Sequence, residues 1–211
     1  MSSLAPQTCF EAALNLAAAI DDRSSYTSGR SRAVVAISRS LALALGTEPS
    51  ELQRLEWACV YCDLGMLSLP DSIVYKPGEL TIRETSQLRS HVHLSLQMIA
   101  DNPPPVPIAD LVGAHHERYD GGGYPRGLRG REVPVLANVI SAADTLIALA
   151  SDRPHRRGFE AGMIAQILSG ERARQFYPDV VDALESLDLV SMLNLRRKSL
   201  PEARQIRVEV A

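Results

Sequence analysis

The sequence predicts an all-α protein. Apolar residues recur at intervals of three and four between the glycines and prolines, as at Val34, Ile37, Leu41 and Leu45, and this is the spacing of one helix face. Glycine and proline gather at positions that would begin or end such segments. With 211 residues, of which 45% are hydrophobic and 22% charged, the chain can form one domain, or slightly more, with a sizeable core.

The N-terminal half is expected to hold helices over residues 9–20, 31–45 and 49–63, and a fourth that starts after Thr81. Gly46 suits the C-terminal end of the second helix, and Pro49 suits the first turn of the third. Residues 67–80 contain Pro70 and Pro77, which predict a connecting loop. Thr81 and Glu84 have the spacing of a capping box.

Four prolines within residues 102–107 end the fourth helix, and a short helix is expected to end at the His115–His116 pair. Further helices are predicted over residues 134–149, 159–168 and 178–187. For the tail, a final helix, a partner-binding arm and disorder all stay open. We therefore divide the chain into an N-terminal helix (1–25), a main domain (26–190) and a tail (191–211).

Charge and patterning exclude several classes of protein. A formal net charge of −3 argues against a nucleic-acid binder. No apolar run has the roughly 18 residues of a membrane helix, and the N-terminus does not resemble a signal peptide, so we expect a cytoplasmic protein. Three cysteines predict reduced thiols. The spacing of Cys59 and Cys62 is also that of a zinc or redox pair, although Cys59 suits a small core residue.

Residues 115–125, HHERYDGGGYP, combine two adjacent histidines, carboxylates and three glycines. Imidazoles and carboxylates are preferred ligands of divalent metals, and glycines let a backbone turn tightly. The segment resembles the signature of the HD-GYP family. Residues 69–81 and 143–156 also resemble family motifs, and the resemblance extends from about residue 26 to 182. It implies an HD-type helical bundle with a glycine-rich GYP loop, and hydrolysis of cyclic di-GMP with two or three metal ions.

The resemblance also implies a set of metal ligands. These are Asp63, which is the catalytic position of the family, and His91, His115, His116 and Asp144. Asp144 lies in an apolar helix and is alternatively a paired core group.

The chain departs from the family at several of these motifs. Cys62 replaces a histidine, Met66 a lysine, and Tyr26 a glutamate that members with a third metal carry. Arg30 replaces another histidine, and a guanidinium has no lone pair with which to bind a cation. Cys62 could ligate only as a thiolate, which favours zinc. We therefore expect at most one divalent ion, whether iron, manganese or zinc, or none.

Arg30 is expected to substitute for a missing ion by pointing between Asp63 and Asp144, the alternative being that it extends into solvent. The positions of Tyr124, Arg153 and Arg156 match family residues that hold the nucleotide, and arginine suits phosphate. The alternative for the two arginines is a solvated surface pair.

These features predict a degenerate, non-catalytic domain of cyclic di-GMP signalling. Binding of cyclic di-GMP and binding of a protein, such as a diguanylate cyclase or another signalling protein, both stay open, as does a homodimer. The alternative is a weak or single-metal phosphodiesterase.

Overall fold

The structure is a computed structural model that describes residues 6–23, 27–152 and 157–198. Within these ranges its regular secondary structure consists of helices joined by loops, and an isolated β-bridge links Arg172 and Phe176. The all-α prediction is confirmed. The α-helices are α1 (Pro6–Asp21), α2 (Arg30–Ala44), α3 (Pro49–Tyr61), α4 (Asp71–Val74), α5 (Ile82–Arg89), α6 (His91–Asp101), α7 (Ala109–Val112), α8 (Val135–Ala150), α9 (Ala161–Gly170), α10 (Pro178–Ser186) and α11 (Leu189–Lys198). Two 3-10 helices, η1 (Leu64–Ser68) and η2 (Gly130–Glu132), complete the set.

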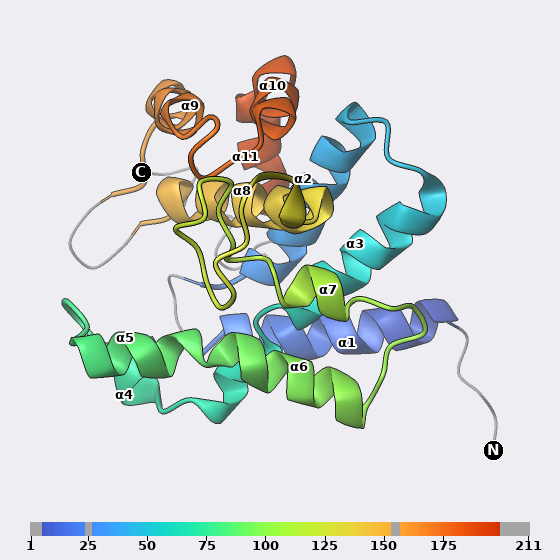
Figure 1. The fold of residues 1–211 in the computed structure, drawn as a ribbon, viewed down its shortest axis with the longest axis vertical. Coiled ribbons are helices and arrows are strands. Elements are labelled where there is room, and N and C mark those ends of the chain that lie inside the picture. Colours follow the sequence, from blue (N-terminus) through green and yellow to red (C-terminus); the bar gives the residue numbers. More distant parts are fainter. Residues whose placement is uncertain (1–5, 24–26, 153–156, 199–211) are drawn as a thin grey trace.

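Helices α2 and α8 form the centre of the bundle. Helix α2 packs against α1, α3, α8, α10 and α11, and its Ile37 and Leu41 are fully buried with Leu146 of α8 and Phe176. In Figure 1, α8 crosses the middle of the molecule, with α9 and α10 on one side and α5 and α6 on the other. The core therefore holds the N-terminus of α2 and the middle of α8 in fixed positions.

Close packing of η1 on α6 positions the residues that follow α3. A Cβ on Gly65 would lie 2.1 Å from the carbonyl oxygen of His91, so only glycine allows this approach. The Gly65 N–H donates to Ser95 Oγ at 2.8 Å, and that hydroxyl donates to the Cys62 carbonyl at 2.9 Å. The chain between α3 and η1, which contains Asp63, is thereby held against the start of α6.

Several predicted boundaries are wrong. Residues 67–80 include the end of η1 and all of α4, because Pro70 precedes a single helical turn that Asp71 begins. The helix expected after Thr81 has its predicted capping box, but a turn at Ser90 divides it into α5 and α6. The short helix α7 ends at Val112, before the histidine pair.

The C-terminal helices lie close to their predicted positions. The tail begins as a helix, α11, that runs to Lys198, and the remainder of the tail is outside the described residues. Among the helices that the structure describes, none combines the length and apolar character that a membrane crossing requires.

Candidate metal centre

Four of the predicted ligands meet at one point. Asp63 lies between α3 and η1, His91 starts α6, and His115 and His116 follow α7. One ligand atom from each of the four lies within 4.8 Å of every other. His91 and His115 are almost completely buried. Segments that are far apart in the sequence thus supply a compact group of three imidazoles and one carboxylate, which could hold a metal ion.

Hydrogen bonds fix the orientation of two imidazoles. Nδ1 of His91 donates to the Leu88 carbonyl at 2.8 Å, and Nδ1 of His115 donates to the Val112 carbonyl at 2.7 Å. Because a carbonyl can only accept, these bonds leave each Nε2 without a proton and with its lone pair free. Such carbonyl contacts are a common support of metal-binding histidines.

The spacing of the ligand atoms suits one ion. His91 Nε2 lies 3.4 Å from His115 Nε2, 3.2 Å from His116 Nε2 and 3.6 Å from Asp63 Oδ1. Ligands about 2.0–2.1 Å from a tetrahedral zinc ion lie about 3.3 Å from one another. These three separations, all measured from His91, are close to that value, so the group could hold a metal ion.

The electrostatics of the group keep the ligands in the protonation states that metals need. Burial lowers the pKa of His115, and burial together with His115 lowers the pKa of His116 to about 2. Burial alone would raise the pKa of Asp63, but Arg30 and the histidines outweigh it and hold that pKa below its usual range. The His115 and His116 imidazoles are therefore neutral and the Asp63 carboxylate is ionised, as metal binding requires.

Arg30, the first residue of α2, lies between two carboxylates. Its Nη1 donates to Asp63 Oδ2 at 2.5 Å, and its Nε donates to Asp144 Oδ1 at 2.8 Å, with Nη2 2.6 Å from the same oxygen. Burial opposes the charge, but the two carboxylates raise the pKa of Arg30 well above its ordinary value. Asp63 therefore turns one oxygen to the guanidinium and the other to the histidines.

The structure does not bring two other predicted ligands into the group. Asp144 is not a member of the four-residue group, because Arg30 engages its carboxylate. Cys62 is buried and directs its Sγ to the Cys59 carbonyl at 3.2 Å. Burial raises the pKa of the Cys62 thiol well above normal, so the thiolate that a metal would need is disfavoured. Cys59 and Cys62 are both free thiols.

Tyr124 covers one side of the histidines. Its ring stacks on His116 with a centroid distance of 4.8 Å and an interplanar angle of 22°. The Arg89 guanidinium lies 4.7 Å from the centre of the Tyr124 ring, within the range of a cation–π contact. The other two predicted nucleotide contacts, Arg153 and Arg156, lie outside the described residues.

A comparison with protein families identifies the fold. A family model described as an HD domain matches residues 15–180. The chain belongs to the HD domain family. It is 33% identical over 171 residues to the "Cyclic di-GMP phosphodiesterase response regulator RpfG" of Xanthomonas campestris pv. campestris. The aligned region covers 80% of this chain and 45% of that protein. It is 32% identical over 157 residues to the "Cyclic di-GMP phosphodiesterase" of Thermotoga maritima, covering 72% and 42%.

Two solved structures share the HD fold of this chain. One is a "cyclic GMP-AMP" specific phosphodiesterase of V. cholerae, V-cGAP3, with a TM-score of 0.67, 14% identity, and coverage of 95% of this chain and 53% of that one. The other is Bd1817 of Bdellovibrio bacteriovorus, titled an HDG"Y"P protein, with a TM-score of 0.64, 20% identity, and coverage of 86% and 62%. The predicted HD-type helical bundle is confirmed. This HD domain spans less than half the length of the two curated relatives.

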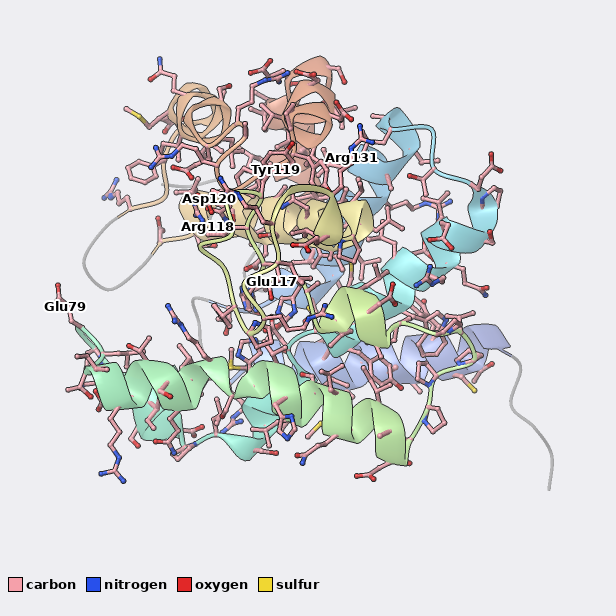
Figure 2. All side chains as sticks on the ribbon, in the orientation of Figure 1. Glu79, Glu117, Arg118, Tyr119, Asp120 and Arg131 are labelled. Carbon is pink, nitrogen blue, oxygen red and sulfur yellow. The ribbon has the colours of Figure 1, made fainter. Side chains whose placement is uncertain are left out.

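Sequence reasoning missed Glu117, which supports the GYP loop (residues 117–130) of this HD domain. The Glu117 side chain is fully buried and accepts hydrogen bonds from the backbone N–H groups of Arg126 at 2.7 Å and Leu128 at 3.0 Å. Figure 2 shows Glu117 on the side of the loop nearer α6, below Arg118, Tyr119 and Asp120. A Cβ on Gly123 would lie 2.4 Å from the backbone nitrogen of Arg118, so the close approach of these two parts of the loop requires glycine. The signal was the position of a carboxylate just upstream of a glycine-rich turn, because the backbone N–H groups of such a turn need acceptors.

A cavity of about 540 Å³ lies beside the ion pairs of Arg30. Arg30, Asp63 and Asp144 line it together with Asp21 at the end of α1, and most of its other lining is apolar. Its volume is within the range of about 300–1,000 Å³ of small-molecule sites. Sequence reasoning did not select Asp21, because its place in this lining depends on the packing of α1 against α2.

Proposed function

We propose that this chain is an HD-GYP domain of cyclic di-GMP signalling that binds the dinucleotide, holds a single divalent ion and does not hydrolyse its ligand. The similarity to relatives named as cyclic di-GMP phosphodiesterases supports the ligand. The observation that carries the loss of hydrolysis is the guanidinium of Arg30 between Asp63 and Asp144.

Arg30 opposes a second ion in two ways. Its positive charge offsets one of the two carboxylate charges, so an added cation would meet weaker attraction together with repulsion from the guanidinium. Its nitrogens also lie 2.5–2.8 Å from the carboxylate oxygens that a second ion would need. Because paired ions assist phosphoryl chemistry by holding both the attacking and the leaving oxygen, a domain with one ion lacks that assistance.

The group formed by Asp63, His91, His115 and His116 could hold a structural ion. Three imidazoles and one carboxylate satisfy all four positions of a tetrahedral ion, and such closed sites are typical of structural zinc, whereas catalytic zinc keeps one position for water or substrate. We assign zinc to this position because imidazoles suit it and the distances from His91 to the other ligand atoms are close to those of a zinc site. His91, His115, His116 and Asp63 would hold the ion, which would then fix the start of α6 to the turn after α7.

The grouped ligands also favour a second candidate function, a single-metal phosphodiesterase. If Asp63 bound more weakly than the histidines, one position would open and the ion could polarise a phosphate. This candidate predicts metal-dependent turnover that His115→Ala abolishes.

Elemental analysis combined with a cyclic di-GMP turnover assay tests the proposal. We expect about one zinc per chain and no turnover, although common enzymes work at about 1–1,000 per second. Arg30→His with Cys62→His should raise the bound metal toward two ions, and adding Met66→Lys gives the best chance of hydrolysis. Turnover by the purified wild type, lost in His115→Ala, would support the second candidate instead. Absence of cyclic di-GMP binding would favour a protein partner such as a diguanylate cyclase.

A further inference from the structure

The cavity beside Arg30 suits an uncharged group better than a phosphate. Ala17, Ile20 and Leu64 are among its apolar walls. Its two cationic side chains in the described lining are already engaged, Arg30 by Asp63 and Asp144, and Lys76 by Glu84 at 2.7 Å. An anionic group placed here would therefore meet carboxylates without a free cation to balance it.

Among the described residues, Asp21 is the carboxylate of the cavity that no cation contacts directly. It is only 5% exposed, and no Lys or Arg nitrogen in the described ranges lies within ion-pair distance of it. Its Oδ2 accepts from the Ser31 N–H at 2.6 Å, and its Oδ1 is 3.1 Å from the Ser31 hydroxyl. A carboxylate has about four acceptor positions. In its ionised form Asp21 therefore keeps acceptor capacity on both oxygens.

We propose that this cavity takes the guanine base of a guanine nucleotide, and that Asp21 selects guanine by accepting two hydrogen bonds from the base. Guanine carries two neighbouring donors on its Watson–Crick edge, N1–H and the N2 amino group, which match a pair of carboxylate oxygens. Adenine carries one donor and one acceptor there, so its acceptor would face an acceptor. Apolar walls and a polar edge contact are the usual means of holding an extruded base.

The inference rests on the proposed function for the identity of the dinucleotide, but it concerns the base alone. It assigns a specificity-determining role to α1. In this arrangement the base enters the cavity and the phosphates stay outside, because the lining that the structure describes offers no free cation for them. The apolar faces of Ala17 and Ile20 would contact the ring.

A structural role for Asp21 is also evident, because its Oδ2 accepts from the backbone N–H of Ser31 at the start of α2 and its Oδ1 accepts from the Ser31 hydroxyl. The two roles predict different effects. If Asp21 only stabilises the start of α2, its loss affects stability whichever nucleotide is present. If Asp21 selects the base, its loss changes the ratio of affinities for guanine and adenine nucleotides.

Calorimetric titration of the full chain with cyclic di-GMP, cyclic di-AMP, GMP and AMP tests the inference at a pH above the raised pKa of Asp21, about 7, where its carboxylate is ionised. The wild type should prefer the guanine ligand of each pair by at least about tenfold, since an unmatched buried polar group is strongly disfavoured. Asp21→Asn offers one acceptor and one donor, so it should weaken guanine binding by about 10- to 100-fold and strengthen adenine binding. The matched control is Asp22→Asn, which changes an exposed neighbour that is absent from the cavity lining and should keep the wild-type preference.

The outcomes separate this inference from the proposed function. Wild-type binding of cyclic di-GMP with the same guanine preference in Asp21→Asn would overturn the role of Asp21 and leave the proposed function intact. GMP binding that depends on Asp21, without cyclic di-GMP binding, would support the guanine site and overturn the proposed dinucleotide. Absence of binding by all four ligands would overturn both.

Discussion

Replacing Arg30 by alanine should destabilise the metal-free protein more than the loss of an ordinary surface arginine does. The substitution removes the guanidinium that lies between Asp63 and Asp144. Both carboxylates would then be partly buried without a positive partner and would repel each other.

The size of the effect follows from the burial of the three side chains. Removing one partner of a buried ion pair costs about 3–5 kcal/mol. Here the side chains of Arg30, Asp63 and Asp144 keep 26%, 20% and 24% of their surface exposed, so water screens part of the repulsion. We expect a loss of about 2–3 kcal/mol in the free energy of unfolding, or a fall of about 5–10 °C in Tm for a chain of this length.

Chemical denaturation of chelator-treated protein measures the loss directly. Arg32→Ala is the matched control, because Arg32 lies on the same helix with 38% of its side chain exposed and contacts Asn15 and Glu11. Adding Asp144→Asn to Arg30→Ala should recover part of the lost stability, because it removes one of the repelling charges. Zinc or manganese should bind the Arg30→Ala protein in greater amount than the wild type.

Two results would refute this reasoning. The first is a loss of stability in Arg30→Ala no larger than in Arg32→Ala, since the guanidinium would then contribute no more than an exposed charge. The second is an Asp144→Asn substitution that fails to restore any stability, which would show that Asp63 and Asp144 do not repel each other in the variant.

Three further predictions concern the packing and the buried acids. Gly65→Ala should cost at least about 2 kcal/mol in denaturation experiments, because its Cβ would meet the His91 carbonyl at 2.1 Å, while Gly162→Ala, with open space around it, should be neutral or stabilising. Glu117→Gln should lower the free energy of unfolding by about 1–3 kcal/mol, because an amide NH₂ would replace one of the two oxygens that accept from the backbone N–H groups of Arg126 and Leu128. Hydrogen exchange should then accelerate across the GYP loop, and unchanged protection would contradict this role. Burial raises the pKa of Asp21 from 3.8 to about 7; the folded state therefore binds this proton more tightly, and the contribution of Asp21 to stability falls as pH rises from about 4 to 7. Asp21→Asn should thus gain stability relative to the wild type over that window, by at most about 4 kcal/mol, and a difference independent of pH would contradict the shift.

The sequence alone determined the fold class, because the spacing of apolar residues and the placement of glycine and proline are local properties that a helix requires. It located the capping box at Thr81 and the helix of residues 135–150 closely. It did not predict the division at Ser90 or the turn of α4, because both depend on how short segments pack against the bundle. Motif resemblance selected Asp63, His91, His115 and His116, which the structure brings together.

Only the tertiary structure decided how the acids of the site are used. Asp144 and Asp63 both have the residue type of a metal ligand, but Arg30 engages Asp144 and shares Asp63 with the histidines. Cys62 and Asp21 likewise depend on their surroundings, since burial keeps the thiol protonated and places the carboxylate in the wall of a cavity. The physical reason is that a residue type fixes which bonds a side chain can make, whereas its partners and its burial, which come from distant segments, fix which of those bonds it makes.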